Sequence, residues 1–291
     1  MSKLLRKYKN GNALITLYDD GTRVIKGNDF DFPLNIDIRV STQCSFGQKE
    51  DGTFVLCNFC HESAQVKGKH CDFSILKQKL EGLPSIELAI GCNEFTDELY
   101  SFLSSIKDHF ICNLTVNAGH LKRDKSKILS AIENKLIYGL GVSYRSLFTL
   151  PDWVLEYDNT VIHVIAGIDD FDNIKNLTAN KILVLGCKDF GFNLAKVNED
   201  QVLVWKRRIH ELFHKHLCFD NLALEQLDIR RFFNDETWNT IYQGEESFYI
   251  DAVNKRISPS SRSNDYSNWD EISLKDYYKE KVSGKNKIKS I

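Results

Sequence analysis

Three cysteines close together in the first quarter of the chain, Cys44, Cys57 and Cys60, have the spacing that most clearly indicates chemistry. Cysteine thiolates are the usual protein ligands of iron–sulfur clusters and also bind zinc. Three thiolates on one loop can hold a [4Fe–4S] cluster and leave one of its irons without a protein ligand. An open iron can bind a substrate or cofactor, as the open position of a catalytic metal does.

A structural zinc ion is the alternative to a cluster at these cysteines. The C-x₂-C half of the motif fits zinc, and Cys71, His61 and His70 are close enough in sequence to supply a fourth ligand. Two features favour the cluster: the predicted strand directly before the loop, and Phe59, the aromatic residue between the paired cysteines. The remaining cysteines fall in or beside predicted strands and are expected to be buried small hydrophobic residues: Cys92, Cys112, Cys187 and Cys218.

The cysteine loop follows the first of at least six predicted β–α units. Short apolar strands that alternate with amphipathic helices are typical of a parallel sheet with right-handed crossovers. The number of units favours a closed or partly closed barrel, with the cysteines at the carboxyl end of its first strand. Strands are predicted at 34–40, 86–90, 112–116, 140–143, 161–165, 182–185 and 217–219, and helices at 73–80, 97–109, 124–134, near 153, at 171–177 and at 200–214.

Two regions lie outside this repeat. The Asp20-Gly21 pair between two short apolar runs predicts a β-hairpin near the N-terminus. Beyond residue 220 the pattern predicts helices, one more strand at 247–253 and a polar, lysine-rich tail. The chain is therefore expected to have three parts: an N-terminal hairpin extension (1–33), an α/β barrel (34–220) and a C-terminal extension packed on the barrel (221–291).

The composition and charge of the chain limit the kinds of partner that we expect it to bind. The chain has 291 residues, 42% hydrophobic and 27% charged, which is ordinary for a globular protein. A formal net charge of −2 gives no electrostatic reason to bind nucleic acid. There is no secretory signal and no apolar run long enough to span a bilayer, so we expect a cytoplasmic protein without a membrane partner. The eight cysteines are then expected to be thiols or ligands rather than disulfides.

The cysteine loop resembles that of the radical S-adenosylmethionine (radical SAM) superfamily. The family's common pattern is CxxxCxΦC, where Φ is aromatic, on the loop after the first barrel strand; Cys57-Asn58-Phe59-Cys60 matches its second half. Here twelve residues separate Cys44 from Cys57, and expanded loops of this kind occur in members such as the 7-carboxy-7-deazaguanine synthases. The resemblance covers roughly residues 34–191, and the whole chain is similar to uncharacterised bacteriophage radical SAM proteins.

The resemblance extends to the end of the second barrel strand. Gly91, Asn93 and Glu94 lie in a segment that looks like a variant of the family's GGE motif, which contacts the amino group of S-adenosylmethionine. Cys92-Asn93 replaces the motif's double glycine. Phe59 would lie near the adenine.

The ends of later predicted strands also match the order in which the family's strands contact S-adenosylmethionine. Asn117, Ser143 and Gly167 fall where the family places contacts to the ribose, carboxylate and adenine of S-adenosylmethionine. Without the resemblance, Asn117 and Ser143 are ordinary polar strand ends, and Gly91 and Gly167 are turns. His163, on a predicted strand, is interpreted either as a hydrogen-bonded core residue or as a site residue.

The resemblance implies a radical SAM enzyme. The cluster and S-adenosylmethionine would be its cofactors, and a donor such as flavodoxin or ferredoxin would supply the electron. Reductive cleavage would give a 5′-deoxyadenosyl radical, which abstracts hydrogen from a substrate that we expect to be a small molecule. The alternatives are a radical SAM enzyme that modifies nucleic acid or polypeptide, and a non-catalytic zinc protein.

Polar residues of the C-terminal region are expected to contact the substrate. Arg230 or Arg262 would pair with a carboxylate or phosphate, although a structural salt bridge is the simpler interpretation of either. No residue of the sequence identifies a catalytic acid or base. The other candidates for substrate contact are Asn221, Glu225, Gln226, residues 243–246 and residues 258–261.

Overall fold

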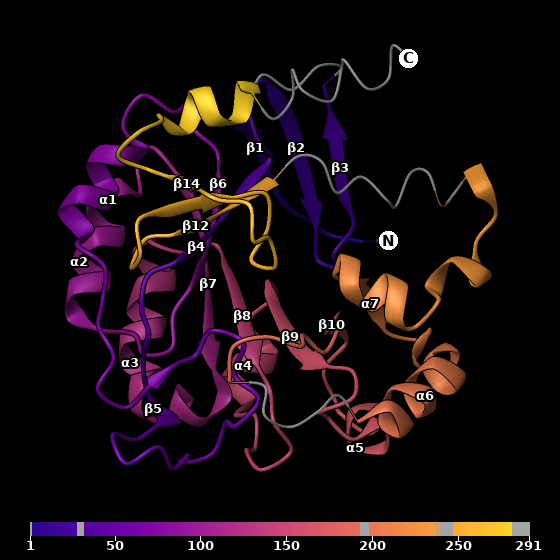
Figure 1. The fold of residues 1–291 in the computed structure, drawn as a ribbon. Coiled ribbons are helices and arrows are strands. Elements are labelled where there is room, and N and C mark those ends of the chain that lie inside the picture. The colour runs from indigo at the N-terminus through magenta and orange to yellow at the C-terminus, as the bar shows by residue number, and fades with distance from the viewer. Residues whose placement is uncertain (1, 28–31, 193–197, 237, 239–246, 281–291) are drawn as a thin grey trace.

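A ten-stranded sheet and a separate three-stranded sheet form the frame of the computed structural model (Figure 1). The structure describes residues 2–27, 32–192, 198–236, 238 and 247–280. The larger sheet contains, in spatial order, β11 (His216–Phe219), β10 (Lys181–Leu185), β9 (Thr160–Ile165), β8 (Gly139–Ser143), β7 (Ile111–Asn117), β6 (Glu87–Gly91), β4 (Asn35–Arg39), β12 (Ser247–Asp251), β13 (Arg256–Ser258) and β14 (Ser267–Asn268).

The larger sheet is parallel from β11 through β12, and only the β12–β13 and β13–β14 pairs are antiparallel. This confirms the predicted α/β class and its mainly parallel sheet. The order runs between two edge strands, β11 and β14, and no pairing among the described residues joins them. The barrel therefore stays a prediction.

Helices connect the parallel strands and begin at the side chains expected to start them. Asp72 accepts hydrogen bonds from the backbone N–H groups of Ser74 and Ile75, and Thr96 accepts one from Leu99. No helix in the described part of the chain is long and apolar enough to cross a membrane. The helices are α1 (Phe73–Leu80), α2 (Asp97–Ile106), α3 (Leu121–Glu133), α4 (Asp152–Glu156), α5 (Phe171–Lys175), α6 (Glu199–Arg208) and α7 (Asn221–Gln226), with another at 274–280.

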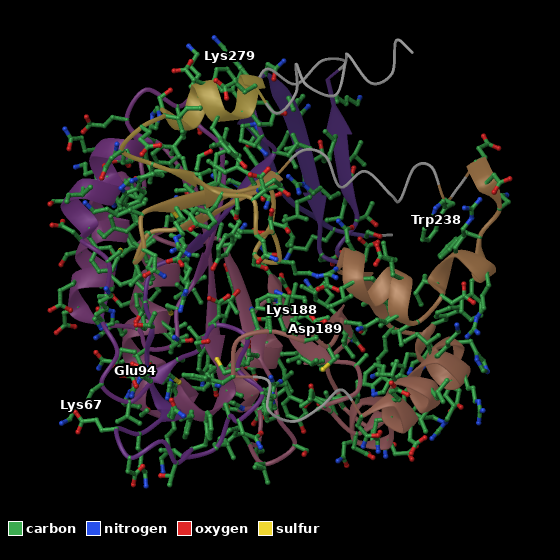
Figure 2. The ribbon with its side chains drawn as sticks, viewed as in Figure 1. Lys67, Glu94, Lys188, Asp189, Trp238 and Lys279 are labelled. Atoms are coloured by element: carbon green, nitrogen blue, oxygen red, sulfur yellow. The ribbon has the colours of Figure 1, made fainter. Side chains whose placement is uncertain are left out.

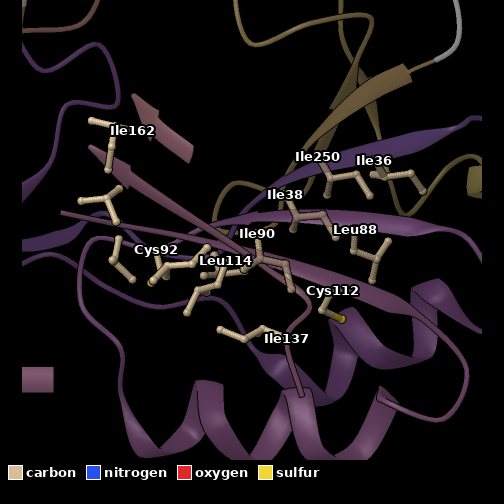
Figure 3. Packing of buried hydrophobic residues seen from close by; sticks show 14 of the residues in the cluster. Ile36, Ile38, Leu88, Ile90, Cys92, Cys112, Leu114, Ile137, Ile162 and Ile250 are labelled. Atoms are coloured by element: carbon tan, nitrogen blue, oxygen red, sulfur yellow. The ribbon is translucent and has the colours of Figure 1, made fainter. Parts of the chain in front are cut away.

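The two faces of the parallel sheet differ. Ile36, Ile38, Leu88 and Ile90 are buried on the face that the helices cover (Figure 3). Parallel strands that are packed on both faces are normally apolar along their whole length. On the other face, most alternate residues from β4 to β8 are polar or small and border a cavity, whereas β9 and β10 also present large apolar residues such as Val161 and Leu183. The polar and small residues that border it are Asp37, Arg39, Ala89, Gly91, Asn113, Thr115, Asn117, Gly139, Gly141, Ser143 and His163.

The N-terminal sheet contains the predicted hairpin and one strand more. β2 (Ala13–Tyr18) and β3 (Arg23–Lys26) pair on either side of the Asp20-Gly21 turn, as predicted. β1 (Leu4–Asn10) pairs antiparallel with β2. It was not predicted because lysine and arginine dominate its sequence.

The C-terminal region contributes strands to the main sheet. β12 lies parallel to β4, with Ile250 opposite Ile38, and it was predicted as a strand at 247–253. The segment after it, predicted as a polar tail, contains β13, β14 and the helix at 274–280. Residues 281–291, most of the lysine-rich tail, lie outside the described residues.

If β12 is an integral strand of the sheet, Ile250→Ala should lower the free energy of unfolding by about 2–5 kcal/mol, because Ile250 is fully buried beside the core. Ile25→Ala, at a position in β3 that is 36% exposed, is the control and should cost less than about 1 kcal/mol. Urea unfolding of both variants provides the comparison. Equal small losses would contradict the pairing of β12 with β4.

Candidate active site

The spacer between Cys44 and Cys57 folds back on itself. Its first arm is β5 (Gln43–Gln48), and Gly52, with φ of +84°, occupies the turn that reverses the chain. On the way back, the Cys57 backbone N–H donates to the carbonyl oxygen of Phe46 at 3.0 Å. The twelve residues of the spacer thus form a hairpin that returns Cys57 to the start of the loop.

A cavity of about 930 Å³ lies on the face of the parallel sheet that the helices do not cover, and residues of the N-terminal sheet line part of it. The cysteine loop lies at the carboxyl end of β4 and forms part of the cavity wall. Glu94 and Gly167 are the two predicted site residues that do not line the cavity. The other predicted residues do line it: Cys44, Cys57, Phe59, Cys60, Gly91, Asn93, Asn117 and Ser143.

The three cysteines lie near one another, with Cys44 and Cys57 buried and Cys60 partly buried. Burial, together with the neighbouring thiols Cys57 and Cys60, raises the pKa of Cys44 to about 12, and burial together with Cys60 raises that of Cys57 to about 11. Burial also raises the pKa of Cys60. Thiols in such a site become thiolates when a cation binds them, since metal ligation requires the deprotonated form. The three thiols are therefore metal ligands by their chemistry, and binding would require their deprotonation.

Arg145 is a cation in this part of the cavity that the sequence analysis did not identify. Its guanidinium lies 4.7 Å from the ring centre of Phe59 and 3.3 Å from a carboxylate oxygen of Asp169. Its positive charge lowers the pKa of Cys57 against the effect of burial. Its buried Nε has no hydrogen-bond partner among the described residues. The sequence did offer one signal that could have identified Arg145: a charged residue two positions after Ser143, the end of a predicted strand.

Glu94 holds the cysteine loop rather than lining the cavity. Its carboxylate accepts a hydrogen bond of 2.7 Å from the backbone N–H of Ser45, the residue after Cys44. Burial opposes ionisation, but this bond and Arg123, 3.7 Å away, keep the pKa of Glu94 below its ordinary value. Figure 2 labels Glu94. The predicted acid is therefore ionised next to the first cysteine.

Two of the predicted residues have clear structural roles. Asn117 accepts a hydrogen bond from the backbone N–H of Gly119, which caps the short 3₁₀ helix at 118–120. Gly167 adopts φ of +90°, and a Cβ there would lie 2.7 Å from Val202. Gly167 is therefore a turn residue, as its sequence without the resemblance indicated. Asn117 borders the cavity and caps a helix at the same time.

An ion-pair network links the cysteine loop to β4 and β12. Arg39 lies 2.8 Å from Glu62 and 3.0 Å from Asp251, and His61 lies 2.9 Å from Glu62. The Tyr249 hydroxyl donates to Glu62 at 3.2 Å. Burial favours protonation of Glu62, but the hydrogen bond from His61 and the charge of Arg39 hold its pKa at about 2. Of these residues only His61 was named from the sequence, as a possible fourth zinc ligand; the others were missed because no short motif unites them.

His163 is a wall residue of the cavity. Its ring makes no hydrogen bond to any described residue, so the hydrogen-bonded core interpretation is wrong. A Cβ on Gly141 would lie 2.7 Å from Cε1 of His163, so the glycine makes room for the imidazole. Burial lowers the pKa of His163 to about 4, and the ring is neutral at pH 7.

The described C-terminal candidates for substrate contact do not line the cavity. Arg230 pairs with Asp235 at 2.9 Å on the surface, the structural salt bridge that was the simpler interpretation. Gln226 bonds both backbone groups of Cys187. Arg262 is exposed and does not line the cavity. Residues 243–246 lie outside the described residues.

The prediction that four other cysteines are buried was correct for three. Cys92, Cys112 and Cys187 are buried, but Cys218 is exposed. Cys218 lies in β11, an edge strand with no neighbour on its outer side in the described sheet, which leaves its side chain uncovered.

No group of three or more His, Cys, Asp or Glu side chains among the described residues is arranged to hold a metal ion. Comparison of the chain with protein-family models, curated proteins and solved structures gave no match.

The lowered pKa of His163 predicts a pH dependence of stability. As the pH falls from 6.5 to 4, the unfolded state takes up a proton that the folded state does not, so His163 costs the folded state up to about 3 kcal/mol. His163→Gln should lack this loss, so the variant should gain stability relative to the wild type over that range.

Urea unfolding at a series of pH values measures the difference between the two proteins, in which other titrating groups cancel. His210→Gln, at an exposed position, is the control for the substitution itself. A constant difference between pH 7 and pH 4 would contradict a buried, neutral His163.

Proposed function

We propose that this chain is a radical SAM enzyme that acts on a small molecule. The observation that carries the proposal is that Cys44, Cys57 and Cys60 line one cavity beside a parallel sheet, and that Cys57 and Cys60 belong to the C-x-Φ-C half of the family's motif. The hairpin at 43–57 supports it further, because its closure offsets the long spacer between the first two cysteines. The proposed fold is a partial (β/α)₆-type radical SAM barrel.

The residues of the cavity suit both proposed cofactors. Cys44, Cys57 and Cys60 would hold the [4Fe–4S] cluster and leave one iron open. When bound and reduced, the cluster supplies the electron that cleaves S-adenosylmethionine and yields a radical able to abstract hydrogen. A cavity of about 930 Å³ lies at the upper end of the range for small-molecule sites, with room for a cofactor and a small substrate.

The polypeptide would contribute binding, orientation and charge compensation. Glu94 would orient the first cysteine through the amide of Ser45. Arg145, fixed between Phe59 and Asp169, would balance negative charge from thiolates and from a bound carboxylate. Gly91 would let a ligand approach β6 closely, since a Cβ there would meet only the Ile38 carbonyl oxygen, 3.7 Å away.

The reaction also needs an electron donor and protection from water. A flavodoxin or ferredoxin would supply the electron, in the cytoplasm. A closed site would limit side reactions of a radical. The neutral charge of the chain favours a small-molecule substrate over nucleic acid.

Anaerobic protein incubated with dithionite and S-adenosylmethionine should form 5′-deoxyadenosine. Cys57→Ser should abolish the product, because the cluster would lose a ligand. Cys112→Ser is a matched control: Cys112 is buried in β7 and does not line the cavity, so the variant should keep the activity. Product quantified by liquid chromatography and mass spectrometry gives the answer. Equal yields from both variants, or none from the wild type after reconstitution with iron and sulfide, would refute the proposal.

A further inference from the structure

One carboxyl group that the strands of the main sheet present to the cavity has no ion-pair partner among the described residues. Asp37, on β4, lines the cavity and makes no ion pair among the described residues. The Asn35 side-chain amide donates to it at 3.0 Å, and no other described side chain hydrogen-bonds to it. Burial raises the pKa of Asp37 to about 6, although the Asn35 bond and the charge of Lys188 act against that rise.

The other charges on this side of the cavity are already engaged. Arg39 contacts both Glu62 and Asp251. Lys188, which follows β10 and is labelled in Figure 2, donates to the Ser261 hydroxyl at 2.9 Å. Asp37 is thus the acidic residue on this side of the cavity whose negative charge the protein compensates least. The Asp37 side chain is open to the cavity, so a ligand can reach it, while the protein around the cavity disfavours its charged form. A cation that meets it there stabilises the carboxylate.

The sheet leaves space beside this carboxyl group. Across the strands, Asp37 is in register with Ala89 on β6, and Ala89 with Asn113 on β7. The next residue in this row is Gly139 on β8. Asp37 and Asn113 therefore flank a hollow above Ala89, since a methyl group fills little of the gap between two longer side chains. On the other side Asp37 is in register with Tyr249 of β12.

The hollow lies deeper than the cysteine loop. Asp37 precedes Arg39 by two residues, about 7 Å along a strand. Arg39 in turn contacts Glu62, which follows the last cysteine of the loop by two residues. A molecule bound at Asp37 would therefore lie below the loop, in the same cavity.

We propose that Asp37 binds a positively charged N–H-donating group of a small molecule, such as an ammonium, amidinium or guanidinium group, in the hollow above Ala89. A cation at hydrogen-bonding distance both compensates the carboxylate and accounts for the absence of an internal partner. A hydroxyl group would satisfy the hydrogen bond and leave the charge uncompensated. That this molecule is the substrate of the radical reaction rests on the proposed function; the cation site does not.

Two probes test the site directly. Calorimetric titration of the anaerobic, reconstituted protein with methylammonium chloride and with methylguanidinium chloride, against sodium chloride at equal ionic strength, measures binding of each cation. The wild type should bind at least one probe, and Asp37→Asn should bind it at least about tenfold more weakly. Asp108→Asn, which removes an exposed carboxylate that has no ion pair, should bind like the wild type.

The stability of the Asp37→Asn variant, and a second variant at Ala89, distinguish a loss of binding from a loss of folding. Asp37→Asn should be at least as stable as the wild type without the probe, because it removes an uncompensated carboxylate. Ala89→Leu fills the hollow and should also abolish binding while it keeps Asp37. Undiminished binding in either variant, or no binding of either probe to the wild type, would overturn the proposal. The same preparation assayed for iron and sulfide separates the outcomes, since loss of the cluster alone would refute only the proposed function.

Discussion

Small residues at alternate positions of the parallel strands are the constraint on which the site depends. At Gly141 a Cβ would lie 2.7 Å from both His163 Cε1 and Thr115 Oγ1, and at Gly139 it would lie 2.7 Å from Asn113 Oδ1. The absence of side chains at these positions allows long polar side chains from neighbouring strands to border a hollow. The helix-covered face has the opposite composition, with large aliphatic residues that supply the packing that the hollow lacks (Figure 3).

Charge then joins parts of the chain that are distant in sequence. Arg39 on β4 contacts Glu62 of the cysteine loop and Asp251 of the C-terminal strand β12. Each partner is less than a quarter exposed, so the pairs are screened less than surface ion pairs, and removal of one partner would leave another charge buried. The loop and the C-terminal region are thus positioned through one guanidinium group. The cavity owes its shape to the sheet and its local charges to this network.

Local sequence patterns predicted most helices and strands, whereas the features that they missed depend on pairing between distant parts of the chain. The helix at 73–80 was predicted with its observed bounds, because the Asp72 cap and its apolar spacing act within a few residues. The cysteines were identified from a motif, but the return of Cys57 to Phe46 depends on hairpin pairing. Asp37 was missed although it alternates with Ile36 and Ile38; that alternation, in a parallel strand, was the available signal. Cys218 was misplaced because an edge strand cannot be read from local sequence.

The cluster is the central claim, and its composition is the most direct measurement. We would purify the chain without oxygen, reconstitute it, and determine iron, sulfide and zinc per chain, beside a variant with Cys44, Cys57 and Cys60 replaced by alanine. The account predicts about four iron and about four sulfide per chain in the wild type, and loss of both in the variant. About one zinc per chain without sulfide would contradict it and assign the cysteines to a structural zinc site.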